Sequence, residues 1–158
     1  MTLCVADVLG KVAERVVIEA PPGAGYEDLG LPLIHAARAH AGKGPLAGMA
    51  AGLSAAADAS VVVFAPCDMP LVHEGIYRVL MREARGAYAL SPNGAEALVA
   101  ALRPGALAAL LVTLAQDTLP RTAAALEAAG ARAIAFDDAA PFANVNTPDD
   151  LARLTRLE

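Results

Sequence analysis

Short apolar runs alternate along the chain with longer stretches in which apolar residues recur at helical spacing. The run Val61-Val-Val-Phe64 is β-branched and aromatic, which favours a strand. Because it has no polar alternation, we expect it to be buried on both faces of a parallel sheet covered by helices. Pro66 and Asp68 follow, which places Asp68 at the carboxyl edge of the sheet, where ligands bind in open α/β folds. Its carboxylate suits a divalent cation on a nucleotide phosphate, and the plainer alternative is that it caps the next turn.

The same spacing rules predict the other elements. Predicted strands cover residues 1–5, 15–20, 29–34, 88–90, 96–102 and 132–136. Predicted helices cover residues 6–13, 46–57, 71–85, 105–114, 119–129 and 148–157. The dipeptide Asn93-Gly94 favours a hairpin turn, so the two strands beside it are expected to pair antiparallel. The alternation predicts an α/β fold, a three-layer α/β/α domain with a mostly parallel sheet and a local antiparallel hairpin.

Composition narrows the classes of partner. The 158 residues are 56% hydrophobic and 18% charged, which suits a single domain over residues 1–158 with a full core. The net charge of −5, with no run of Lys or Arg, argues against nucleic acid or an anionic membrane as the main partner. No apolar window is long enough to span a bilayer. The two cysteines and the absence of a signal-like start predict a cytoplasmic protein.

The segment 42–48 combines glycines with the start of a predicted helix. Its residues Gly44, Pro45, Leu46, Ala47 and Gly48 lie where backbone amide groups can approach a ribose, base or phosphate. Pro45 suits the first turn of that helix, where its missing amide hydrogen costs little. The alternative is a flexible turn followed by a close helix contact through small residues. We expect the lysine in this segment to be a solvated side chain.

A second polar segment covers residues 144–150. Thr147 is a good N-cap and Pro148 suits the first helical position, which needs no further function. Asn144 and Asn146 are not needed for the cap, and in an extended segment both side chains point the same way. Two amides so arranged can bind an oxygen-rich ligand, although both also occur as turn-forming residues.

The histidines and cysteines show no pattern of a metal site. The three histidines lack metal-ligand spacing with Cys4 or Cys67, so we expect them on the surface or in loops. Cys67 beside Asp68 is interpreted as a buried thiol.

Three motifs, at 44–49, 66–70 and 144–151, resemble the successive motifs of the molybdenum cofactor guanylyltransferases in order and spacing. The resemblance covers nearly the whole chain, and Asn144 with Asn146 favours the guanylyl branch over the related cytidylyltransferases. It implies a Rossmann-like nucleotidyltransferase fold that joins GMP from GTP to molybdopterin, with Mg²⁺ and release of pyrophosphate. By the same resemblance, Asp68 is the catalytic, magnesium-binding aspartate and 44–48 lies along the guanosine. The two asparagines face the pterin phosphate or its metal-bound oxygens.

One family feature is absent from the sequence. Members of the family begin with a strand and a Gly-Gly loop that wraps the triphosphate, whereas here the apolar residues 1–5 lead straight into a helical pattern at Ala6. Either a loop between Val5 and Ala6 is left out of the sequence or the chain lacks it. A relative that binds nucleotide or pterin without catalysis is therefore an alternative, as is a cytidylyltransferase of the same fold. The sequence leaves both a monomer and a weak homo-oligomer open.

Overall fold

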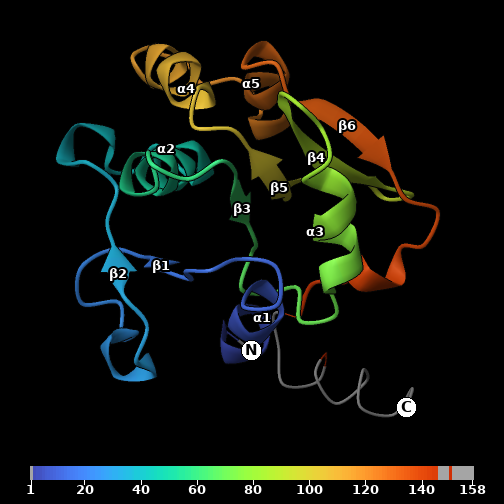
Figure 1. The fold of residues 1–158 in the computed structure, drawn as a ribbon. Helices are drawn as coiled ribbons and strands as arrows, with labels where there is room; N and C mark the ends of the chain where they lie inside the picture. The colour runs from blue at the N-terminus through green and yellow to red at the C-terminus, as the bar shows by residue number, and fades with distance from the viewer. Residues whose placement is uncertain (1, 146–149, 151–158) are drawn as a thin grey trace.

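The computed structural model describes residues 2–145 and 150 and has the alternating helices and strands of an α/β protein (Figure 1). The helices are α1 Thr2–Leu9, α2 Pro45–Ala55, α3 Glu74–Leu80, α4 Ala106–Leu114 and α5 Thr122–Ala128. The strands are β1 Ile18–Glu19, β2 Leu33–Ile34, β3 Val62–Phe64, β4 Gly86–Ser91, β5 Gly94–Leu102 and β6 Arg132–Ala135. The short 3₁₀ helices of the described residues are η1 Glu27–Leu29, η2 Arg38–His40 and η3 Ala140–Phe142. The predicted α/β class is confirmed.

The main sheet has the strand order β3-β5-β4-β6. β4 and β6 pair in parallel, whereas β5 runs antiparallel to both of its neighbours, so β3, β4 and β6 share one direction. β1 and β2 form a separate two-stranded parallel sheet. The predicted hairpin is present as β4 and β5, with its turn at Pro92 and Asn93, one residue before the predicted dipeptide. Gly94 begins β5 with a φ of 129°, a conformation that favours glycine.

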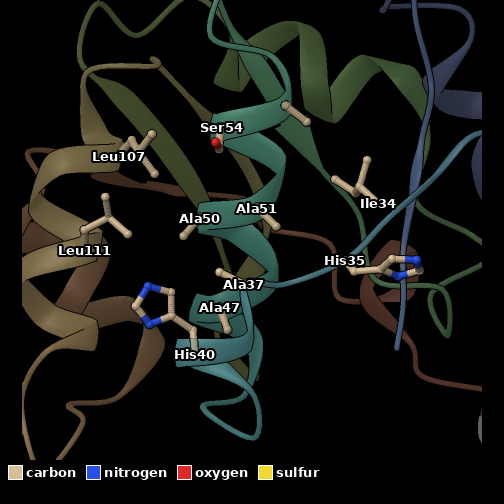
Figure 2. Close-up of a pocket in the computed structure, with 11 residues that line it drawn as sticks. Ile34, His35, Ala37, His40, Ala47, Ala50, Ala51, Ser54, Leu107 and Leu111 are labelled. Atoms are coloured by element: carbon tan, nitrogen blue, oxygen red, sulfur yellow. The ribbon is translucent and has the colours of Figure 1, made fainter. Parts of the chain in front are cut away.

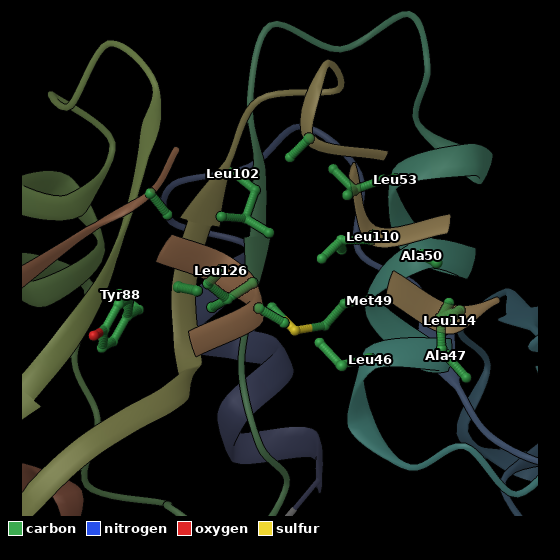
Figure 3. Close-up of a cluster of buried hydrophobic side chains, with 14 residues drawn as sticks. Leu46, Ala47, Met49, Ala50, Leu53, Tyr88, Leu102, Leu110, Leu114 and Leu126 are labelled. Atoms are coloured by element: carbon green, nitrogen blue, oxygen red, sulfur yellow. The ribbon is translucent and has the colours of Figure 1, made fainter. Parts of the chain in front are cut away.

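Two apolar clusters cover opposite faces of the main sheet. Successive residues of β5 alternate between them, since Ala100 and Leu102 join one cluster while Val99 and Ala101 join the other. The first cluster lies under α2, α4 and α5 (Figure 3), and its fully buried leucines are Leu53, Leu102, Leu110, Leu114 and Leu126. The second cluster is formed with α3 and η3 and contains the buried Tyr77 and Phe142. This arrangement gives the predicted three layers.

β3 differs from its prediction because of its place in the sheet. All three of its residues are half-buried rather than buried on both faces. Its side chains do alternate between the two clusters, with Val62 and Phe64 against the first and Val63 against the second. The strand remains partly exposed because it lies at the edge of the four-stranded sheet.

The predicted N-terminal strand is wrong. Helix α1 runs through the bond between Val5 and Ala6, and the backbone nitrogen of Gly10 donates to the Ala6 carbonyl oxygen at 2.9 Å. Val5 is buried, and Val8, Leu9 and Val12 pack against the second cluster. This i, i+3, i+4, i+7 pattern is that of one amphipathic helix face. The residues on both sides of the bond between Val5 and Ala6 therefore belong to one helix.

The end of β5 is tied to two neighbouring segments by one side chain. The Arg103 guanidinium donates to the backbone oxygens of Ser60 at 2.9 Å, Met81 at 3.0 Å and Glu83 at 3.1 Å. It thus holds the segment before β3 and the segment after α3 together. The predicted helix 148–157 lies outside the described residues, and no helix within 2–145 is long and apolar enough to cross a membrane.

Candidate functional site

A cleft of about 450 Å³ brings together three segments that are far apart in the sequence. Pro45 at the first position of α2, Asp68 after β3, and Asn144 all line it. The remaining lining residues are Pro66, Met69, Ala95, Glu96, Ala97, Leu98, Arg121, Thr122 and Ala123. The cleft therefore contains at least one residue from each of the three sequence motifs.

Asp68 is half-buried in this cleft, with its position set by the chain on both sides. β3 ends at Phe64, and Pro66 turns the chain toward the cleft wall. The backbone carbonyl oxygen of Asp68 accepts a hydrogen bond from the backbone nitrogen of Val145 at 2.7 Å. Val145 is only 2% exposed, so this bond is anchored in the interior and fixes the neighbouring Asn144 beside Asp68. Asn144 itself is exposed, and Asn146 lies outside the described residues.

The glycine-containing segment meets the cleft through its first residues. Gly44 is the N-cap of α2 with a φ of 66°, and Pro45 follows at the first helical position. Leu46 and Ala47 are buried in the first cluster, where they hold the helix against the sheet. At Gly48, an added Cβ would lie 2.6 Å from the Oε2 of Glu19, so this position has no room for a side chain as the neighbours stand.

Lys43 is not the solvated side chain that the sequence suggested. It is half-buried, and its Nζ donates to the carbonyl oxygen of Leu114 at the end of α4. A cation at a helix C-terminus interacts favourably with the unpaired carbonyl groups there. Lys43 therefore links the start of α2 to the end of α4 and is not directed to a ligand.

Two charged residues of the cleft were missed by sequence analysis. Glu96 lies in β5 and is half-buried, with its Oε1 accepting a hydrogen bond from the Ser91 hydroxyl at 2.8 Å. Arg121 is exposed and precedes α5 as its N-cap residue. No local motif marks either residue, because they reach the cleft only through the pairing of β5 and the docking of α5. The guanidinium group can bind a phosphate through two parallel hydrogen bonds.

The oxygen atoms that line the cleft fit a hard cation whose remaining ligands are waters and substrate phosphate oxygens. Across residues 2–145 and 150, no group of three or more His, Cys, Asp or Glu side chains could hold a metal ion. Asp68 offers a carboxylate and Asn144 an amide oxygen, which are oxygen ligands of the type that Mg²⁺ takes. Mg²⁺ usually keeps several waters and substrate phosphate oxygens, so one or two protein ligands are enough.

The histidines and cysteines lie elsewhere. His73 is exposed, and the Nδ1 of His35 donates to the carbonyl oxygen of Ala20 at 2.5 Å. His40 lines a second cavity of about 320 Å³ between α2 and α4, where its Nδ1 is buried without a hydrogen-bond partner in the described part of the chain (Figure 2). Cys67 is exposed, which corrects its interpretation as a buried thiol. Its neighbours Pro66 and Asp68 line the cleft, and Cys67 itself is not among the lining residues.

Comparisons with known proteins agree with the fold and with the family resemblance. The sequence profile of the MobA-like NTP transferase domain matches residues 1–141. The molybdenum cofactor guanylyltransferase of Cereibacter sphaeroides is 35% identical over 157 residues, covering 97% of this chain and 80% of the relative. That of Rhodobacter capsulatus is 36% identical over 148 residues, covering 92% and 76%. The crystal structure of molybdopterin-guanine dinucleotide biosynthesis protein A from Archaeoglobus fulgidus superposes with a TM-score of 0.70 at 25% identity, covering 98% of this chain and 84% of that one.

Proposed function

Because the chain belongs to the family of MobA-like NTP transferase domains, we propose that it transfers GMP from GTP to molybdopterin and releases pyrophosphate. The observation that carries this proposal is the shared cleft of Pro45, Asp68 and Asn144. Each comes from a different motif of the family resemblance, and a common site is what a two-substrate transfer requires. The cleft also contains Arg121, a cation beside Asp68 and Glu96 that can bind an anionic group of a substrate.

We assign Asp68 to hold Mg²⁺ together with the nucleotide phosphates. An ion held there would neutralise charge that develops on the phosphate oxygens and on the departing pyrophosphate. Asp68 is suited to this role because it is half-buried, so its carboxylate is partly shielded from water yet open to the cleft. The hydrogen bond from Val145 to its backbone keeps it in place.

The remaining residues position the two substrates. The start of α2, from Gly44 to Gly48, lies along the guanosine, with Pro45 as its residue in the cleft wall. Asn144 faces the pterin phosphate or its metal-bound oxygens, and the sequence predicts the same role for Asn146, which lies outside the described residues. In phosphoryl transfer the protein contributes mainly position and charge neutralisation. Holding both substrates in one cleft therefore supplies much of the rate enhancement.

A second candidate function is the binding of nucleotide or pterin without transfer. The observation that favours it is the cleft itself, because Pro45, Asp68 and Asn144 line one site that can hold a ligand whether or not transfer follows. A cytidylyltransferase of the same fold is the third candidate. Competition between GTP and CTP for the protein separates the guanylyl from the cytidylyl activity.

The test of the proposal is the replacement Asp68→Asn. It keeps the shape of the side chain and removes the charge, so the fold is expected to remain while GMP transfer falls by about a hundredfold or more, as expected for several kcal/mol of lost charge stabilisation. Asp58→Asn is the matched control, because Asp58 is exposed and pairs only with Arg15 at 3.6 Å among the described residues. An unchanged transfer rate for Asp68→Asn at saturating Mg²⁺ refutes the assigned role. Binding of GTP by the unaltered protein with no product at any Mg²⁺ concentration supports the non-catalytic candidate.

A further inference from the structure

We propose that Glu96 determines specificity in this cleft by binding the 2-amino-4-oxopyrimidine edge that guanine and a pterin share. The inference rests on the proposed function, since it takes guanine and pterin as the two heterocycles to be held. It adds a residue outside all three sequence motifs and a chemical feature of the ligand that this residue recognises.

The Glu96 side chain is held in a defined orientation at the cleft. Its Oε1 accepts a hydrogen bond at 2.8 Å from the hydroxyl of Ser91, which is only 5% exposed. The Ser91 oxygen in turn accepts from the backbone nitrogen of Asn93 at 3.1 Å. Within residues 2–145, no hydrogen bond reaches the other oxygen, Oε2. The turn of the hairpin therefore orients the carboxylate through Oε1 and leaves Oε2, together with the second lone pair of Oε1, for a ligand.

An irregularity in the β4–β5 ladder produces this orientation. Tyr88 pairs with Ala100, but the next residue, Ala89, pairs with Glu96, so three residues of β5 have no opposite residue on β4. In an unbroken ladder Ser91 would pair with Ala97, and Glu96 would then point to the opposite face from Ser91. With the irregularity, both side chains lie on the same face and can form their hydrogen bond. Bulges of this type often re-aim a side chain next to an active site.

The chemistry of a carboxylate matches the edge of these heterocycles. Ionised Glu only accepts hydrogen bonds, and it has two oxygens. Guanine presents a ring N–H beside an exocyclic amino group, and a pterin presents the same pair. Two parallel donors facing two acceptors form a bidentate, charge-assisted contact. Hypoxanthine lacks the amino group, and lumazine carries an oxygen in its place, so both lose part of this contact.

The rest of the cleft wall is compatible with a flat ring. Beside Glu96 it consists of Ala95, Ala97, Leu98 and Ala123, which are small or aliphatic. Apolar walls with a few placed polar groups are typical of sites for small heterocyclic ligands. A role confined to bracing the hairpin would need only the Oε1 contact with Ser91 and would not affect the choice between ligands.

The experiment measures ligand preference with the full chain in the presence of Mg²⁺. Dissociation constants are determined for GTP against ITP and, by fluorescence, for pterin against lumazine. If Glu96 binds the amino-bearing edge, the unaltered protein prefers the first member of at least one pair by about tenfold or more, as a charge-assisted hydrogen bond provides. Glu96→Gln is expected to reduce that preference to about twofold, because the amide replaces one acceptor with a donor.

Two further variants separate recognition from structure. Glu27→Gln alters an exposed carboxylate of η1 outside the cleft and is expected to leave both preferences unchanged. Ser91→Ala removes the hydroxyl that orients Glu96 and is expected to give a preference between those of the unaltered protein and Glu96→Gln. Thermal unfolding by circular dichroism verifies that each variant is folded.

The outcomes identify the ligand or overturn the inference. Loss of the GTP preference alone assigns Glu96 to the nucleobase, and loss of the pterin preference alone assigns it to the pterin. A folded Glu96→Gln variant that keeps both preferences, or that weakens all four ligands equally, overturns the inference and leaves the proposed function standing. So does an unaltered protein that binds GTP and pterin without preference. If it binds none of the four ligands, the proposed function and this inference both fail.

Discussion

Replacing Gly86 with alanine is expected to destabilise the fold more than the same replacement at Gly94. The two glycines begin the paired strands β4 and β5, and both have a positive φ, 109° at Gly86 and 129° at Gly94. They differ in their surroundings. A Cβ at Gly86 would lie 2.9 Å from the Ala101 carbonyl oxygen and 3.2 Å from the Leu102 Cα, whereas a Cβ at Gly94 would have nothing within 4 Å.

The magnitude follows from two separate costs. Backbone strain at a positive φ costs about 1–3 kcal/mol and applies to both variants, and it is offset by about 0.4–1 kcal/mol from the lower entropy of the unfolded alanine chain. Overpacking costs about 1–3 kcal/mol more and applies only at Gly86. It cannot be relieved by a side-chain rotation, because two of the three nearest atoms belong to the backbone of β5. The variants should therefore differ by about 1–3 kcal/mol in the free energy of unfolding.

Urea-induced unfolding followed by far-ultraviolet circular dichroism measures this difference, since the chain has no tryptophan for fluorescence. With an m-value of about 2 kcal/mol/M, a difference of about 2 kcal/mol moves the midpoint by about 1 M. The slopes should be the same in all three proteins, because the surface exposed on unfolding is unchanged. Equal midpoints for Gly86→Ala and Gly94→Ala would refute the reasoning, since they would show that β4 and β5 separate without cost.

Three further predictions concern hydrogen bonds and thiols. The Tyr88 hydroxyl donates to Glu127 at 2.5 Å, and this bond, with burial, raises the pKa of Tyr88 to about 12. The bond stabilises the protonated form of Tyr88, so below pH 10 the unaltered protein is expected to be more stable than Tyr88→Phe by about 1–2 kcal/mol in the free energy of unfolding. This difference is expected to vanish as the pH rises to 12, and urea unfolding across that pH range measures it. Arg103→Lys is expected to lower the free energy of unfolding by about 2–4 kcal/mol, because an ammonium group cannot contact three separated carbonyl groups at once. A decrease equal to that of a surface Arg→Lys control would contradict this prediction. Cys67 and Cys4 are both exposed and should react with a thiol reagent, and nucleotide is expected to protect only Cys67, whose neighbours on both sides line the cleft. In a Cys4→Ala variant only Cys67 reacts, so comparison with the unaltered protein gives the protection of each thiol. Equal protection of both thiols would contradict a ligand in that cleft.

The hairpin and the edge strand show how far the sequence predicts the fold. The β4–β5 hairpin was predicted from residues next to one another, and it is present with its turn shifted by one residue. β3 was located correctly, but its partial exposure follows from strand order, which depends on pairings between distant segments. The start of α1 is wrongly predicted as a strand, because a short apolar run such as residues 1–5 fits both a strand and a helix. The helical spacing that continues to Val12 begins at Val5.

The residues of the candidate site also fall into those that a local sequence signal predicts and those that only the fold brings to the cleft. Asp68 and Asn144 were chosen because an acid after a strand and an amide not needed for a cap are local signals, and the structure brings both to one cleft. Their roles remain predictions. Glu96 and Arg121 carry no local signal, since one enters the cleft through an irregular strand register and the other through the docking of α5. Properties that depend on register and docking cannot be obtained from the spacing of residues alone.

The bond from Val145 to the Asp68 backbone has a consequence for how the protein is made. Because a ribosome adds about 5–20 residues per second, it adds Asp68 to the chain several seconds before Val145. A nascent chain in that interval has the strand and the acid but not the segment that closes the cleft. Substrate binding in the cleft therefore cannot assist the early stages of folding. It requires a polypeptide whose synthesis has passed Val145.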